Sequence, residues 1–185
     1  IEDITRTLDD ILELARIGRP GEAMEVTDLG ALVTSVVEEY EDLGEPIEAG
    51  ELQRLALPLR PTMLRRAIRN LVDNALKYGA PDTPVNVVLD LAQGDLARIV
   101  VSDEGEGIAS EQIPHLTRRF YRTDPGRSRA SGGTGLGLAI VKHIVERHRG
   151  RLDITSQLGK GTRVVVRLPL AQAEGALPDE SKQVS

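Results

Sequence analysis

The chain has 185 residues, and its 23 lysines and arginines against 29 aspartates and glutamates give a formal net charge of −6. This balance argues against a protein whose main role is to coat nucleic acid, because neutralising phosphates needs an excess of positive charge. The absence of cysteine excludes disulfides and thiolate metal sites, and no apolar run reaches the roughly 18 residues that span a bilayer, so we expect a soluble, cytoplasmic protein.

Residues 1–17 predict one amphipathic helix, because apolar side chains recur there at helical spacing. The sequence Gly-Arg-Pro-Gly at 18–21 ends it. A single helix cannot bury its own apolar stripe, so we expect it to lie on the following domain or to pair with another helix. The stripe consists of Ile4, Leu8, Ile11, Leu12 and Ala15.

The first half of the following domain predicts two helices and three strands. Thr27 or Asp28 has a side-chain oxygen that can cap a helix start. Pro61 indicates a second start, since the first turn of a helix tolerates proline, and Gly79 indicates where that helix stops. The expected elements are helices over 28–43 and 61–78 and strands over 52–60, 85–91 and 97–101.

The second half combines a long loop with a final helix and a hairpin. Residues 102–134 are rich in Gly, Ser and Arg, and a loop of this length in a compact domain is typically a lid or a binding loop. We expect one short helix within it, near Ser110–Leu116. The remaining expected elements are a helix over 136–148, strands over 151–156 and 162–168, and a disordered tail over 171–185.

A polar stripe lies beside the apolar stripe of the helix expected over 61–78. Its members stand at positions i, i+4, i+7 and i+8, so they share one side of the helix. Amide oxygens suit a hard cation such as Mg²⁺, and an ammonium group suits phosphate. A solvated helix face is the alternative interpretation. The stripe consists of Asn70, Asn74, Lys77 and Tyr78.

An acidic segment with two glycines follows directly on the strand expected over 97–101. Asp103 stands at the strand end, and Gly105 and Gly107 would let the backbone approach a flat ligand. The carboxylate can accept a hydrogen bond from an exocyclic amine. An ordinary acidic turn is the alternative.

The glycine-rich run Gly132–Leu138 opens directly into a helix, where unsatisfied N–H groups and the helix dipole bind anions. A dinucleotide fingerprint is excluded because position 138 is leucine, and a P-loop is excluded because Lys160 is followed by neither Ser nor Thr. Just before this run, arginines form either a local anion attractor or a solvated charge run. They are Arg118, Arg119, Arg122, Arg127 and Arg129.

In this order, the motifs resemble the ATP-binding catalytic domain of sensor histidine kinases, in the superfamily shared with gyrase B, Hsp90 and MutL. Residues 70–78 match the N box, 103–108 the first glycine box, 120–122 the end of the F box and 133–138 the second glycine box. The resemblance implies a two-layer α/β sandwich, with a mixed sheet packed on helices in the Bergerat-type ATP-binding fold, preceded by one amphipathic helix.

The resemblance also implies a site for ATP and Mg²⁺. Asp103 would accept from the adenine amino group, between Tyr78 and Ile108. Asn74 would be the protein ligand of Mg²⁺, and Lys77 and Arg122 would position the phosphates, with no further catalytic residue implied. The full implied nucleotide-binding set is Asn70, Asn74, Lys77, Tyr78, Asp103, Gly105, Gly107, Ile108, Tyr121, Arg122, Thr134, Gly135, Leu136, Gly137 and Thr162.

Domain organisation and partners follow from the same resemblance. Residues 1–17 look like the second helix of a dimerisation and phosphoacceptor hairpin, 18–27 like a linker and 28–170 like the catalytic domain. The implied partners are a phosphoacceptor hairpin, in the same protein or in trans, and a response regulator receiver domain. No nucleic acid and no membrane contact by this chain are implied, although the parent kinase would be a membrane-bound bacterial sensor.

None of the three histidines lies in a phosphoacceptor-like segment, and we expect His115, His143 and His148 to be structural or surface residues. The γ-phosphoryl group would therefore go to a histidine that this chain lacks, without independent autophosphorylation. Two alternatives stay open: a serine/threonine kinase of the anti-sigma-factor type, and a non-catalytic nucleotide-binding or dimerisation module. Hydrolysis in the gyrase or Hsp90 manner is disfavoured, because Arg66 and Arg69 stand where a general-base glutamate would precede the N-box asparagines.

Overall fold

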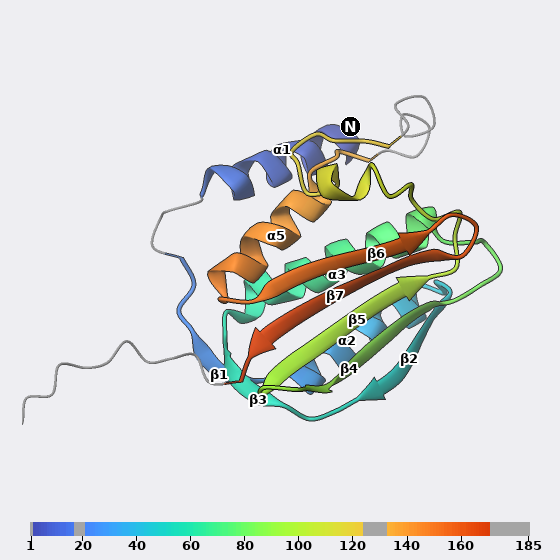
Figure 1. The fold of residues 1–185 in the computed structure, drawn as a ribbon. Coiled ribbons are helices and arrows are strands. Elements are labelled where there is room, and N and C mark those ends of the chain that lie inside the picture. Colours follow the sequence, from blue (N-terminus) through green and yellow to red (C-terminus); the bar gives the residue numbers. More distant parts are fainter. Residues whose placement is uncertain (1, 17–20, 124–132, 171–185) are drawn as a thin grey trace, which may run out of the picture.

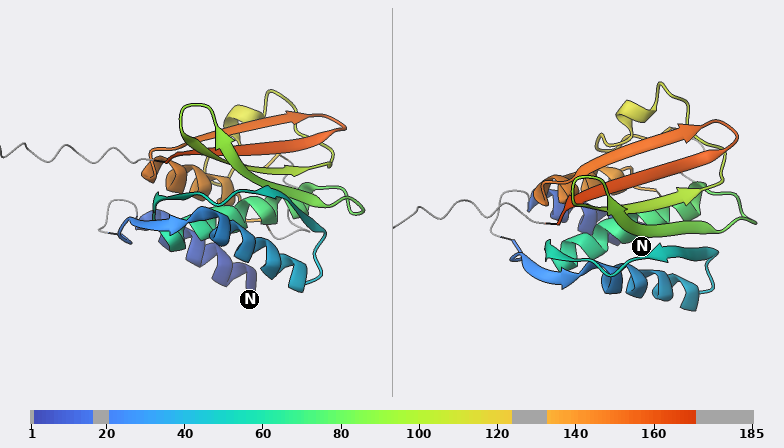
Figure 2. Two further views of the ribbon diagram at one scale, coloured as in Figure 1. Left: turned by 90° about the horizontal axis from the view of Figure 1, so that it is seen from below. Right: turned by 60° about the horizontal axis from the view of Figure 1, so that its bottom comes forward.

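The computed structural model describes residues 2–16, 21–123 and 133–170. A five-stranded sheet forms one layer of the domain, and helices cover one of its faces as the second layer (Figures 1 and 2). The strand order is β2-β4-β5-β7-β6, with β2 parallel to β4 and every other pair antiparallel. The strands are β2 (Ile47–Leu52), β4 (Val85–Ala92), β5 (Leu96–Asp103), β6 (Arg151–Gln157) and β7 (Gly161–Pro169). The expected two-layer sandwich with a mixed sheet is confirmed.

The helices begin and end close to the predicted positions. Asp28 caps α2 by accepting a hydrogen bond from the Ala31 amide at 3.1 Å. Pro61 opens α3 and Gly79 ends it, as predicted. The helices are α1 (Glu2–Ala15), α2 (Leu29–Asp42), α3 (Pro61–Tyr78), the short 3₁₀ helix η1 (Ile113–His115) and α5 (Gly137–Arg147).

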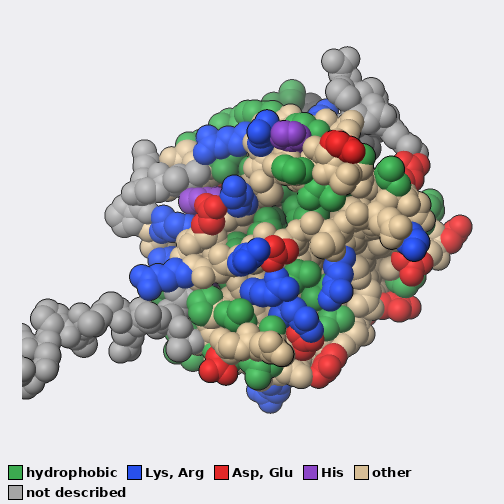
Figure 3. Space-filling view, viewed as in Figure 1, with side chains coloured by type: hydrophobic (Ala, Val, Ile, Leu, Met, Phe, Trp, Pro, Cys, Tyr) green, Lys and Arg blue, Asp and Glu red, His purple; other side chains and the backbone are tan. Residues whose placement is uncertain are grey.

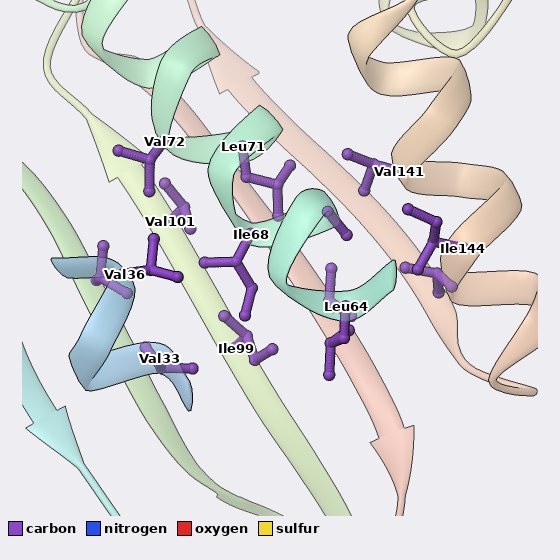
Figure 4. Packing of buried hydrophobic residues seen from close by; sticks show 14 of the residues in the cluster. Val33, Val36, Leu64, Ile68, Leu71, Val72, Ile99, Val101, Val141 and Ile144 are labelled. Carbon is purple, nitrogen blue, oxygen red and sulfur yellow. The ribbon is translucent and has the colours of Figure 1, made fainter. Parts of the chain in front are cut away.

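The core lies between the sheet and the helices and is aliphatic. Figure 4 shows Leu64, Ile68 and Leu71 of α3 between the sheet and α5. On β5, Ile99 and Val101 point into this layer, and each is at most 1% exposed. The apolar stripe predicted for α3 is therefore its buried face, which fixes the rotation of the polar stripe beside it.

The strands that precede α3 differ from the predicted ones. The single strand expected over 52–60 is the end of β2 and all of β3 (Ala56–Leu59), which belong to different sheets. β3 pairs antiparallel with β1 (Glu25–Asp28), a strand that the sequence did not predict. β2 is an edge strand whose first residue alone is buried, so it lacks the alternation that would reveal it. The helix expected near 110–116 is reduced to η1.

α1 lies on the domain beside α5 (Figure 1), and the side chains that it buries there are not those of its apolar stripe. Its buried side chains are Asp10 and Leu14, each 8% exposed. The apolar stripe is not buried against this domain, because its side chains point to solvent, so pairing of the stripe with another helix remains the open prediction. The exposed members are Ile4, Leu8, Ile11 and Leu12.

The start of α3 is held by residues distant in sequence. The Glu22 carboxylate accepts from the Thr62 and Met63 amides at 3.0 and 3.2 Å, so the segment expected as a linker caps this helix. His148, 1% exposed, accepts from the Arg60 amide at 2.9 Å through Nε2 and lies 2.7 Å from the Ile144 carbonyl through Nδ1. Burial lowers the pKa of His148, which is a structural residue as predicted.

Among the described helices, none covers the second face of the sheet, where charged side chains lie among apolar ones (Figures 1 and 3). Cross-strand register aligns Asp90, Arg98, Arg167 and Arg151 in one row across four strands. Arg98 pairs with Asp90 at 2.5 Å. The helices and the core lie on the opposite face. The predicted site residue Asp103 lies at neither face but at the end of β5, so the candidate site is at the ends of the strands.

Candidate functional site

The predicted site lies where the C-terminal ends of α3 and β5 meet. Tyr78 is the last residue of α3 and Asp103 the last of β5. A Cβ atom on Gly105 would lie 1.9 Å from the Tyr78 carbonyl oxygen and 3.0 Å from Asp103 Oδ1, so the approach of these segments requires glycine. The structure therefore brings these three predicted site residues together.

The Asp103 carboxylate is half-buried and retains capacity to accept hydrogen bonds. The Gly105 amide donates to its Oδ1 at 2.9 Å, and the backbone of Thr162 also hydrogen-bonds to it. Burial raises the pKa of Asp103 above its usual value, while these two hydrogen bonds oppose the rise. A carboxylate has about four lone-pair sites, so this one can still accept from an amino group of a ligand.

The turn between β6 and β7 packs on the first glycine box. Gly107 has φ +73°, and a Cβ atom there would lie 2.1 Å from the Gln157 carbonyl oxygen. The Ile108 amide donates to Ser156 Oγ at 2.8 Å, and the same hydroxyl is 2.8 Å from Thr162 Oγ1. Ser156 was missed by the sequence analysis, although the predicted hairpin places it opposite Thr162. It links two predicted site residues.

The polar stripe of α3 faces the second glycine box. Asn74 Oδ1 lies 3.9 Å from the position of a Cβ on Gly137, and Lys77 Nζ lies 2.0 Å from that position on Gly133. Asn70 Nδ2 is buried and has no hydrogen-bond partner in the described part of the chain. A buried donor without a partner is costly unless a ligand satisfies it, so this donor favours the interpretation of the stripe as the wall of a polar site.

The second glycine box opens α5 and is held by polar contacts. Leu136 is fully buried at the N-cap position, where no side chain caps the helix. The Leu136 amide donates to Thr134 Oγ1 at 3.2 Å, and that hydroxyl donates to Asp10 of α1 at 3.0 Å. An uncapped helix start with the positive end of its dipole favours an anion. This box is the part of the site that suits phosphates.

The end of the F box contacts the second glycine box through its backbone. The Phe120 amide donates to the Gly135 carbonyl at 2.9 Å. The Tyr121 ring instead packs on His115, with 5.6 Å between ring centroids. Arg122 follows and is half-buried. Of the other arginines in this stretch, Arg118 and Arg119 are exposed, whereas Arg127 and Arg129 lie outside the described residues.

The donor set fits a metal that keeps most of its water. Within the described ranges, no group of three or more His, Asp or Glu side chains could hold a metal ion alone. Mg²⁺ takes few protein ligands and is often bound together with substrate phosphates, so one amide oxygen such as Asn74 Oδ1 suits it. The buried donor of Asn70 suits an oxygen of the same ligand.

Comparisons with known proteins show which family this sequence belongs to. Residues 60–172 match the family described as "Histidine kinase-, DNA gyrase B-, and HSP90-like ATPase". The chain is 38% identical over 180 residues to the phosphate regulon sensor protein PhoR of Pseudomonas aeruginosa, covering 91% of the chain and 39% of PhoR. It is 34% identical over 177 residues to the sensor histidine kinase RppB of Synechocystis, covering 90% and 38%. The chain thus spans about two fifths of these curated relatives.

Solved structures show the same fold. A mycobacterial sensor histidine kinase, MprB, superposes with a TM-score of 0.68 at 29% identity, covering 79% of this chain and 97% of that one. Full-length ShkA in complex with AMPPNP superposes with a TM-score of 0.77 at 24% identity, covering 94% and 37%. Among the described helices, none is long and apolar enough to cross a bilayer.

Proposed function

Because this chain belongs to the histidine kinase-, DNA gyrase B- and HSP90-like ATPase family, we propose that its site positions Mg·ATP to donate the γ-phosphoryl group to a histidine. The chain carries the ATP-binding catalytic domain of sensor histidine kinases.

At the end of β5, Asp103 would recognise the adenine amino group. Its half-burial and remaining lone pairs support this role. Tyr78 and Ile108 would line the base, and Thr162 would act beside them through its contact with Ser156. Gly105 and Gly107 would act by letting the chain close around this end of the site.

At the start of α5, the second glycine box would receive the phosphates. Amides of Gly135 and Leu136 would donate to phosphate oxygens, with Thr134 and Gly137 beside them. Lys77, together with Tyr121 and Arg122 of the F box, would contribute charge and hydrogen bonds. Asn74 would hold Mg²⁺, with Asn70 adjacent, and the bound ion would neutralise phosphate charge. Positioning and electrostatic stabilisation are most of what phosphoryl transfer requires of a protein.

The acceptor histidine would lie outside this chain. His148 is 1% exposed and both of its ring nitrogens are engaged. His143 and His115 are half-buried on α5 and η1, and the ring of His115 packs on Tyr121. A phosphoacceptor hairpin, in the same protein or in trans, would supply the acceptor, and a response regulator receiver domain would take the phosphoryl group from it.

The same proposal covers the organisation of the parent protein. Residues 1–17 would be the remaining second helix of the hairpin, 18–27 a linker with structural contacts, and 28–170 the catalytic domain. The parent would be a bacterial membrane-bound sensor with this domain in the cytoplasm. The serine/threonine kinase and the non-catalytic module are not favoured, since the curated relatives are sensor kinases.

The observation that carries the proposal is the half-buried Asp103 at the edge of the wall that contains the unsatisfied Asn70 amide. We expect saturable ATP binding by calorimetry in the presence of Mg²⁺, and loss of that binding in Asp103→Asn, which cannot accept equally from an amine. Asp95→Asn, an exposed change at the other end of β5, is the matched control. Equal ATP affinity of Asp103→Asn and the parent chain would contradict the adenine role.

Transfer is tested separately. The chain is incubated with radiolabelled ATP and a hairpin domain that carries an acceptor histidine, and the product is treated with acid. We expect labelling of the hairpin that acid removes, because phosphohistidine is acid-labile. Acid-stable labelling would instead favour a hydroxyl acceptor, and binding without any transfer would favour a non-catalytic module.

A further inference from the structure

α1 contacts the candidate phosphate end of the site through one buried carboxylate. Asp10 Oδ2 accepts from the Thr134 hydroxyl at 3.0 Å, and Oδ1 accepts from Arg66 of α3 at 3.0 Å. Thr134 Oγ1 in turn accepts from the Leu136 amide at 3.2 Å. The Asp10 carboxylate is therefore two hydrogen bonds away from the amide of Leu136, the N-cap residue of α5.

The rest of this contact is also polar. Arg66 reaches Glu13 of α1 at 3.4 Å, and Arg6 of α1 reaches Asp73 of α3 at 3.0 Å. A charge is costly to bury unless it is paired, and Asp10 at 8% exposed has such a partner in Arg66. These contacts hold α1 in one orientation on α3 and the second glycine box.

The docked position of α1 affects the box in two ways. The Leu136 amide, which the proposed function gives to a phosphate oxygen, is engaged by Thr134. In addition, a carboxylate lies beside the box, where an anionic ligand would be repelled. Both effects act on phosphate groups and neither acts on the adenine end, where Asp103 lies on a different element.

We propose that Asp10 is a positioning residue that holds Thr134 and thereby lowers the affinity of the site for phosphate groups, so that docking of α1 and binding of a nucleoside triphosphate oppose each other. The inference rests on the proposed function, because it needs a phosphate-binding role for Leu136. By linkage, the triphosphate must weaken the docking of α1 by the factor by which docking weakens the triphosphate.

The test compares two ligands that share the nucleoside and differ in the triphosphate and its Mg²⁺ ion. Dissociation constants of Mg·ATP and of adenosine are measured by calorimetry for the parent chain, Asp10→Ala and Asp10→Asn. We expect Asp10→Ala to bind ATP about fivefold or more tightly than the parent, the lower end of usual coupling factors, with adenosine unchanged. Asp10→Asn keeps the shape and an oxygen acceptor but loses the charge, so a smaller gain in the same direction is expected.

Asp9→Asn is the matched control, because Asp9 is an exposed neighbour on the same helix and the change in net charge is equal. We expect no change in ATP affinity there. Unchanged or weaker ATP binding by Asp10→Ala and Asp10→Asn would overturn the inference, as would an equal gain by Asp9→Asn or an equal gain for adenosine. Failure of the proposed function is a different result: the parent chain would then bind neither ligand in a manner that depends on Asp103.

Reciprocity gives a second readout that does not need a variant. Hydrogen exchange of the α1 amides is followed in the parent chain without ligand, with adenosine and with Mg·ATP. We expect exchange in α1 to become faster with ATP and to stay unchanged with adenosine. Slower exchange in α1 with ATP would overturn the inference, because it would mean that the triphosphate strengthens docking.

Discussion

Gly105 and Gly133 lie at the two ends of the site and have different neighbours: main-chain atoms exclude a side chain at Gly105, whereas the nearest atom to Gly133 is the tip of a lysine side chain. A Cβ atom on Gly105 would meet a backbone carbonyl at 1.9 Å, but one on Gly133 would meet the tip of Lys77 at 2.0 Å. A backbone atom in a packed interior cannot withdraw, and a lysine ammonium can. The end proposed to bind adenine is therefore expected to be rigid, and the end proposed to bind phosphates is expected to be adjustable.

The largest expected effect is that of Gly105→Ala. Because the new methyl group overlaps the Tyr78 carbonyl, we expect a loss of about 3 kcal/mol in the free energy of unfolding and loss of binding of both ATP and adenosine. Chemical denaturation and calorimetry measure the two effects. Gly94→Ala is the control: its Cβ has open space, so only backbone strain at φ +79° remains, about 1–2 kcal/mol. Equal unfolding free energies of Gly105→Ala and Gly94→Ala would contradict the rigidity of the end that contains Gly105.

The next largest effect is expected for Asn74→Ala, which tests the end of the site that contains the second glycine box. Removing the amide oxygen should weaken Mg·ATP binding about tenfold, ~1.4 kcal/mol, while the affinity for adenosine and the unfolding free energy stay close to those of the parent chain. The comparison of ATP with and without Mg²⁺ shows whether the loss is metal-dependent. A loss that is equal for adenosine would mean that the two ends are not separable.

Gly133→Ala should reduce stability and ATP affinity less than the two preceding variants. Lys77 can move away from the added methyl group, so we expect the unfolding free energy to change by less than about 1 kcal/mol, in contrast to Gly105→Ala. ATP affinity should fall about threefold, roughly 0.7 kcal/mol, because the displaced ammonium is farther from the phosphates, and adenosine affinity should not change. Destabilisation as large as that of Gly105→Ala would contradict the adjustable character of this end.

A fall in pH should lower the unfolding free energy of the whole domain slightly and so affect both ends of the site together. The pKa of His148 is lowered by burial, so the unfolded chain binds a proton more readily than the folded one, and the unfolding free energy should decline as the pH falls below about 6.5. Thermal unfolding at pH 7.5 and 5.5 measures the decline. His148→Gln, which has no titrating group there, should be less stable at pH 7.5 and less sensitive to pH over this interval. An unchanged pH dependence in that variant would assign the effect to other groups.

The sequence predicted α3, β4, β5, α5 and the final hairpin because each has a strong periodic pattern and clear boundary residues. β2 was missed because an edge strand with one buried residue has no alternation, and β1 was missed because it has four residues and none of them is buried. The apolar stripe of α1 does not mark the face that contacts the domain, because apolar spacing takes no account of ion pairs such as that between Asp10 and Arg66.

For the site, local motifs placed Asn74, Lys77, Asp103 and the glycines on the correct elements. What they could not supply were contacts between distant segments. Ser156 is 48 residues from Ile108, and Thr134 is 124 residues from Asp10. Such contacts depend on the packing of elements, which no local window of sequence contains.

The anchoring of the first turn of α3 has a consequence for the order of folding events. This turn needs the Glu22 carboxylate from 40 residues upstream and the His148 ring from 88 residues downstream. Closing loops of this length costs conformational entropy before any contact repays it, which slows folding. During synthesis on a ribosome, the helix that carries Asn70, Asn74 and Lys77 would therefore wait for nearly the whole domain to emerge before its start is secured.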